Sequence, residues 1–89
     1  MSEKEDHQRS LIARLRRVEG QIRGIQGMIE KESSCEQIAH QLAAARRALD
    51  RAFYEMLACS MKVEISAAKN TADAKLAGEH VSRLLAKYG

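Results

Sequence analysis

Apolar residues recur near the start of the chain in alternating steps of four and three positions. The members of this row are Leu11, Leu15, Val18, Ile22, Ile25 and Ile29. Such steps keep apolar side chains on one side of an α-helix and are typical of helices that pack against other helices. The row predicts a helix over about residues 6–31, with Ser2 and Glu5, or Asp6, placed to cap its start.

A second row with the same steps follows after a polar break at residues 31–34. Its members are Cys35, Ile38, Leu42, Ala45, Leu49, Ala52, Met56, Cys59 and Val63. The segment Ser34-Cys35-Glu36-Gln37 fits the S-x-x-Q capping box, with Ser34 as the N-cap and Cys35 at the first helical position. The pattern therefore predicts a second helix over about residues 35–67.

A shorter third helix is predicted over about residues 73–88, beginning after Thr71 or Asp73. The residues expected to face inward are Ala77, Val81, Leu84 and Tyr88. The predicted fold class is all-α: a long antiparallel helical hairpin followed by a short third helix.

The composition points to an assembly of chains rather than to an isolated bundle. Eighty-nine residues form one small domain, 1–89, whose core is limited, and the two cysteines provide no disulfide framework. Apolar residues make up 45% of the chain and charged residues 30%, so helix packing shared between chains is expected to supply stability. Gly20, Gly24 and Gly27 lie inside the first predicted helix, which suggests that another backbone approaches there.

The net charge is only +3, so the clustering of positive side chains matters more than their sum. The first residues, MSEKEDHQRS, lack the apolar centre of a signal peptide, and no apolar run approaches the roughly 18 residues of a membrane span. We therefore expect a cytoplasmic protein that does not enter the membrane. Thiols are reduced in that compartment, so the cysteines are inert, metal-binding or reactive rather than bridged.

The two cysteines lie on one row of one predicted helix, 59 − 35 = 24 residues apart. At about 1.5 Å per residue the separation is roughly 36 Å, so Cys35 and Cys59 can meet only between two antiparallel copies of the helix. In that register, opposed positions sum to 94, and large residues mostly face small ones, as Leu42 faces Ala52 of the second copy. This favours a twofold dimer built as an antiparallel four-helix bundle. Cys59 as a small core residue stays open as the simpler interpretation.

Arginines crowd both long helices. They are Arg14, Arg16, Arg17 and Arg23 in the first and Arg46, Arg47 and Arg51 in the second. The antiparallel register places residue 47 at the dimer axis, where arginines from two chains repel each other unless an anion joins them. Phosphate of a nucleic acid is the predicted anion, with a solvated charged surface as the alternative. No helix-turn-helix pattern is evident.

The histidines are scattered at His7, His40 and His80, and no H-x-x-x-H or C-x-x-C pair occurs. His7 lies on the extended first row and is the best placed of the three to act as a metal ligand. The sequence lacks a Gly-rich phosphate loop, a nucleophile elbow and paired catalytic carboxylates. We therefore expect a protein that is not an enzyme and that requires no cofactor.

The segments RLRRVEGQIRGIQGMIE and QLAAARRALDRAF, with Cys35 between them, resemble the CsoR/RcnR/FrmR family of small all-helical bacterial repressors. Members of that family sense copper, nickel or cobalt, formaldehyde, or persulfides. The resemblance implies antiparallel dimers that pair into tetramers, and operator DNA as the partner. It also implies that Arg14, Arg17, Arg46 and Arg47 contact DNA. Cys35 matches the family's first sensor residue, which acts across the dimer interface.

The sequence departs from the family on the second helix. Metal- and formaldehyde-sensing members carry His where this chain has Ser60, and a Cys or His ligand where it has Glu64. Cys59 lies one residue before the usual His. Persulfide sensors also use two cysteines per chain, although their second Cys lies at the later position.

These patterns lead to one main hypothesis and several alternatives. The main hypothesis is a repressor that releases DNA when a reactive sulfur species, oxidant or electrophile acts at Cys35 and the partner's Cys59. The first alternative is a soft metal such as Cu(I) held by Cys35, Cys59 and His7. Formaldehyde acting at Cys35 and the N-terminal amine is a further possibility. An all-α chorismate mutase-like enzyme and a structural coiled-coil adaptor are the remote alternatives.

Overall fold

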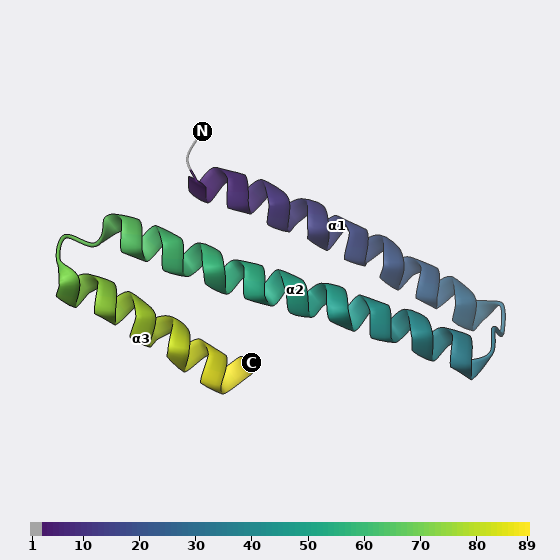
Figure 1. Cartoon of the computed structure of the whole chain (residues 1–89). Helices are drawn as coiled ribbons and strands as arrows, with labels where there is room; N and C mark the ends of the chain where they lie inside the picture. The colour runs from purple at the N-terminus through teal and green to yellow at the C-terminus, as the bar shows by residue number, and fades with distance from the viewer. Residues whose placement is uncertain (1–2) are drawn as a thin grey trace.

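The computed structural model describes residues 3–89 and consists of three α-helices in the order α1, α2, α3. Helix α1 spans Glu3–Glu30, α2 spans Cys35–Ala67 and α3 spans Thr71–Tyr88. Helices α1 and α2 form a long antiparallel hairpin, and α3 folds back along the C-terminal half of α2 (Figure 1). The described residues include no strand, and the predicted all-α hairpin with a short third helix is confirmed.

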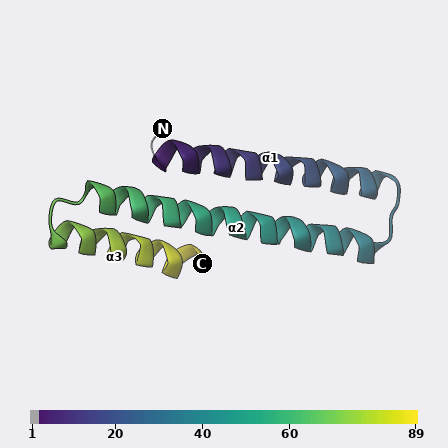
Figure 2. The same cartoon turned by 45° about the horizontal axis from the view of Figure 1, so that its top comes forward.

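The three helices lie side by side in a single flat layer, with α2 between α1 and α3 (Figure 2). The Cα atoms extend over 58 × 31 × 12 Å. The Cα atoms of one helix span about 4.6 Å, and the axes of packed helices lie about 8–10 Å apart, so an extent of 12 Å leaves no room for a second layer of helices. Since domains normally consist of two or more packed layers around a core, a chain folded as one layer leaves both of its broad faces uncovered.

The first helix begins at Glu3, earlier than the predicted start near residue 6. Asp6 therefore lies inside α1 and is not its cap, while the alternative cap, Ser2, lies outside the described residues. The C-terminal end turns at Glu32, which has a left-handed φ of 58°. Backbone N–H groups of Glu32 and Ser33 donate to the carbonyls of Ile29 and Met28, the pattern of a Schellman cap without its usual glycine.

The second helix begins where the capping box predicts. The Ser34 hydroxyl accepts a hydrogen bond from the backbone N–H of Gln37 at 3.2 Å. The third helix begins at Thr71, two residues before the predicted start, because Asn70 is its N-cap. The Asn70 side chain accepts from the N–H of Asp73 at 2.9 Å, and the Asp73 carboxylate accepts from the N–H of Lys69 at 3.1 Å.

The apolar rows of α1 and α2 divide into a buried half and an exposed half. The buried half steps by seven residues and consists of Val18 and Ile25 in α1 and of Ala45, Ala52 and Cys59 in α2, each 8% exposed or less. These residues form the contact between the two long helices. Small residues on α2 permit a close approach to the branched residues of α1.

The exposed half also steps by seven residues. It consists of Leu15, Ile22 and Ile29 in α1 and of Leu42, Leu49 and Met56 in α2, which are 39–57% exposed. We call these six residues the apolar face. Among the described residues no large side chain is fully buried, which follows from the single-layer architecture.

One expectation about packing was wrong, and another was incomplete. Tyr88 is 60% exposed rather than inward-facing, although Ala77 and Val81 are buried as predicted. Leu57, outside the predicted row, is buried, which reflects that α2 packs against α3 as well as α1. A Cβ atom on Gly20, Gly24 or Gly27 would meet nothing within 4 Å, so the predicted approach of another backbone stays a prediction about a second chain.

Within the described residues, no helix combines the length and the apolar composition that a membrane crossing requires.

Candidate effector site and nucleic-acid interface

His7 and Cys59 line one cavity, of about 230 Å³, between the start of α1 and the C-terminal half of α2. Helix geometry explains the meeting, because both residues extend the rows along which α1 and α2 pack. Cys59 is 8% exposed, while Met56 of the apolar face forms part of the same wall. The cavity therefore brings together two of the three predicted metal ligands.

Cys35, the third predicted ligand, lies at the far end of the hairpin. It occupies the first position of α2 and is exposed, whereas Cys59 lies near the other end of the same continuous helix. The structure therefore keeps the two thiols apart within one chain, as the spacing of 24 residues predicts.

Glu64 lines the same cavity and is held by α3. One carboxylate oxygen, Oε1, lies 2.9 Å from Nδ1 of His80. The other oxygen, Oε2, is buried and has no hydrogen-bond partner among the described residues. A buried carboxylate oxygen without a donor is unusual, and this one belongs to a residue on the cavity wall.

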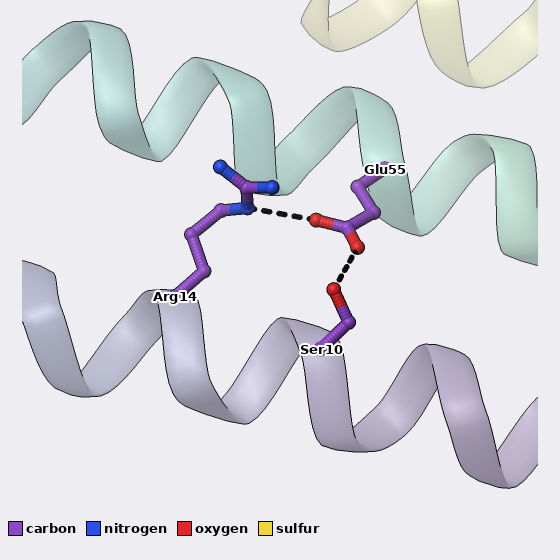
Figure 3. Close-up of polar contacts among 3 residues, drawn as sticks. All are labelled: Ser10, Arg14 and Glu55. Atoms are coloured by element: carbon purple, nitrogen blue, oxygen red, sulfur yellow. Dashed lines mark hydrogen bonds and ion pairs between the residues drawn. The ribbon is translucent and has the colours of Figure 1, made fainter.

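Glu55 also lines this cavity, and its carboxylate ties α2 to α1 (Figure 3). The Ser10 hydroxyl donates to Oε1 at 2.6 Å, and Nε of Arg14 donates to Oε2 at 2.8 Å. These two hydrogen bonds, with smaller contributions from the charges of Arg14 and His7, lower the pKa of Glu55 despite opposing desolvation. Glu55 is therefore held as a carboxylate with both oxygens occupied.

Arg14, Arg17, Arg47 and Arg51 line a wider hollow, of about 480 Å³, between the middle parts of α1 and α2. We call it the basic groove. Its wall also includes Gln21, whose buried Oε1 has no hydrogen-bond partner among the described residues. Three of the four predicted DNA contacts meet here, and Arg46 is not among the lining residues. Arg51 is an addition that the resemblance did not supply.

The basic groove and the apolar face lie on opposite sides of the helical layer. Successive residues of an α-helix are about 100° apart, so Leu15 and Arg17 lie on opposite sides of the buried Val18. The same relation holds in α2 for Leu49 and Arg51. Because α1 and α2 are antiparallel, both apolar rows face one side of the layer and both sets of arginines face the other.

A single chain does not supply a complete metal site. The described residues contain no group of three His, Cys, Asp or Glu side chains that could hold a metal ion. The cavity provides one thiol and one imidazole, from Cys59 and His7. These are donors for a soft or borderline transition metal, so the residues fit such an ion only if another chain adds a ligand.

The remaining histidines have local partners. Nε2 of His40 lies 3.9 Å from a carboxylate oxygen of Glu36 one turn away, and both side chains are exposed. His80 is engaged with Glu64. Sequence reasoning missed the roles of Ser10 and Glu55, because they depend on which residues face each other across the hairpin.

Two comparisons with known proteins bear on this site. The sequence pattern of the family described as metal-sensitive transcriptional repressors matches residues 7–87. A relative, the copper-sensing transcriptional repressor CsoR of Bacillus subtilis, is 41% identical over 44 residues. That alignment covers 49% of this chain and 44% of the relative, so it spans less than half of either protein. No solved structure is a significant match.

The hydrogen bonds that Ser10 and Arg14 donate to Glu55 lead to a testable prediction. Ser10→Ala removes the hydrogen bond that lowers the pKa of Glu55 most, so this pKa should rise, as carboxyl ¹³C NMR titration would detect. The substitution should also lower the free energy of unfolding at neutral pH by about 1 kcal/mol.

A lowered folded-state pKa contributes stability above the pKa of the unfolded chain and loses it as pH falls through the folded value. The stability difference between wild type and Ser10→Ala should therefore shrink in acid. A difference that is unchanged below the folded pKa of Glu55 would contradict the assigned cause.

Proposed function

This chain belongs to the metal-sensitive transcriptional repressor family, and we propose that it binds operator DNA and releases it when a transition-metal ion binds between two subunits. The observation that carries the proposal is the cavity shared by Cys59 and His7, which holds two suitable ligands and lacks a third. A repressor acts where the DNA is, which agrees with the expected cytoplasmic location.

We infer that a second copy covers the apolar face. Six large side chains stepping by seven residues on one side of a one-helix layer match the seam of a four-helix bundle. In the antiparallel register with positions summing to 94, the partner subunit's Cys35 stands opposite Cys59. The partner then supplies the missing ligand, and each dimer holds two equivalent sites. Pairing of dimers into tetramers is part of the same proposal.

The donor set favours Cu(I) as the first metal to test. Two thiolates with one imidazole are soft ligands, and soft ligands select Cu(I) among biological metals. Ser60 and Glu64 stand where many family members have further ligands, so Cys59 and His7 would replace them in this chain. The bound ion would tie the ends of two subunits together, and both cysteines would bind it as thiolates.

The metal hypothesis has more support than the thiol-reaction hypothesis. The family description and the relative both refer to metals. In addition, Cys59 is 8% exposed, and a buried thiol reacts slowly with solutes. Family membership also favours a repressor over the mutase-like enzyme and the coiled-coil adaptor.

The basic groove is the proposed DNA interface. Guanidinium groups bind phosphate through paired hydrogen bonds, and the groove gathers four of them on the side of the layer away from the apolar face. Arg46 remains a candidate contact outside the groove. Phosphate contacts position a protein on DNA without reading its sequence, so these arginines account for affinity rather than for operator choice.

Neighbouring arginines provide a matched test of this interface. Arg47→Ala should weaken DNA binding more than Arg46→Ala, because Arg47 lines the groove and both substitutions remove one charge. The slope of log K against log salt should fall in magnitude by about 0.9 for each phosphate that the variant no longer neutralises. Fluorescence anisotropy at several salt concentrations measures both quantities. Equal weakening by the two substitutions would argue against the groove as the interface.

Mixing two cysteine variants tests the metal site between subunits. Cys35→Ala and Cys59→Ala should each abolish tight Cu(I) binding alone. In a mixed dimer of the two variants, one site lacks both cysteines and the other keeps both. Heterodimers should therefore regain about half of the wild-type Cu(I) capacity.

Competition with a Cu(I) chelator measures that capacity in heterodimers purified by two different tags. No recovery would exclude a site shared by antiparallel subunits. A disulfide between residues 35 and 59 without any tight Cu(I) binding would instead favour the thiol-reaction hypothesis.

A further inference from the structure

We propose that Tyr54 is a further DNA-binding residue, whose hydroxyl donates a hydrogen bond to a phosphate beside the basic groove. Neither the family resemblance nor the lining of the groove assigns this residue. The inference rests on the proposed function, because it adds an uncharged contact to the proposed DNA interface.

Tyr54 continues the row of groove arginines along α2. It follows Arg47 by seven residues and Arg51 by three. At about 100° per residue, seven residues complete two turns of an α-helix to within about 20°, so Tyr54 and Arg47 extend in nearly the same direction. Leu49 of the apolar face lies about 140° away from Tyr54 around the helix. Tyr54 therefore lies on the side of the layer that carries the basic groove, and not on the side that a second copy covers in the proposed dimer.

The Tyr54 side chain is accessible and carries a suitable donor. It is 51% exposed, and its hydroxyl makes no hydrogen bond among the described residues. A phenol has one O–H donor, and the oxygens of a DNA phosphate are acceptors. Tyrosine is one of the side chains that contact phosphate in protein–DNA complexes. The exposed hydroxyl therefore matches the chemistry of the DNA backbone.

The neighbouring aromatic ring restrains Tyr54 before any ligand arrives. The rings of Phe53 and Tyr54 form an edge-to-face contact, with centroids 5.3 Å apart and planes inclined at 70°. A tyrosine side chain has only two rotatable torsions, and a side chain held in place before binding loses less entropy in the complex. The hydroxyl is therefore presented to DNA at a small entropic cost.

An uncharged donor strengthens the interface without adding to its charge. The four arginines that line the groove carry like charges, which repel one another in the free protein. Another cation at position 54 would increase this repulsion, whereas a phenol does not. A hydrogen bond to an ionised acceptor is also stronger than one between neutral groups. Tyr54 should thus raise the affinity for DNA without changing the number of phosphates that are neutralised.

Tyr54→Phe tests this contact, because it keeps the ring and removes only the hydroxyl. Mixed-sequence duplex DNA serves as the probe, since phosphate contacts do not depend on sequence. The affinity should fall by at least about threefold. The slope of log K against log salt should stay at the wild-type value, because no charge is lost. Fluorescence anisotropy at several salt concentrations measures both quantities, and an unchanged affinity would overturn the inference.

Tyr88→Phe is the matched control, the same change at the second of the two tyrosines in the chain. Tyr88 is 60% exposed and ends α3, which lies on the far side of α2 from α1 and the groove (Figure 2). Its DNA affinity should equal that of wild type. Equal losses in the two variants would show that the position beside the groove has no special role, and the inference would be wrong.

A ¹⁹F NMR measurement separates DNA from the alternative occupant, another copy of the chain. Protein labelled with 3-fluorotyrosine has two signals, which the Tyr88→Phe variant assigns. Duplex DNA should shift the signal of Tyr54 and leave that of Tyr88 in place. A Tyr54 signal that moves with protein concentration but not with DNA would assign the side chain to a contact between copies and refute the inference.

The same experiments distinguish failure of the inference from failure of the proposed function. If wild type binds DNA while Tyr54→Phe binds equally well, the inference is wrong and the proposed function stands. If wild type does not bind duplex DNA even at low salt, the proposed function itself fails.

Discussion

Half of the apolar row on each long helix stays 39–57% exposed within its own chain, and this constraint shapes the rest of the molecule. Val18, Ile25 and the small residues of α2 satisfy the contact between α1 and α2. The other half of each row lies on one open side of a layer only 12 Å deep. Burying such side chains is the main favourable contribution to folding, so the hairpin is complete only when a second layer covers it.

The two faces of the helical layer have different roles in the proposed function. In the proposed dimer, a partner's Cys35 reaches the cavity of Cys59 from the side that needs a second subunit, where Met56 of the apolar face forms part of the cavity wall. The opposite side carries the arginines of the basic groove. In the proposed function, effector and DNA act on different faces of a layer that is one helix thick, and Glu55 of the effector cavity contacts Arg14 of the basic groove directly. Because the layer is one helix thick, residues that line the effector cavity and residues that line the basic groove can contact each other directly.

The helices, the hairpin and the cap at Ser34 were predictable because they follow from local spacing and short-range hydrogen bonds. The division of each apolar row into buried and exposed residues was not predictable. The sequence shows which residues share one side of a helix, but it does not show how much of that side a neighbouring helix covers. Glu55 and Ser10 are 45 positions apart, and their contact depends on the register of α1 against α2.

The end of α1 at Glu32 was not predictable, because glycine is the usual residue at a left-handed position and this chain has glutamate there. Asn70 was overlooked as a cap because Thr71 and Asp73 are equally suitable residue types.

The mass of the wild-type protein in solution tests the need for a second layer most directly. Sedimentation equilibrium over a range of protein concentrations should give an even multiple of the chain mass of 9.9 kDa. Circular dichroism on the same samples should show the helical content of the hairpin. A species of 9.9 kDa that keeps its full helical content at every concentration would contradict the account.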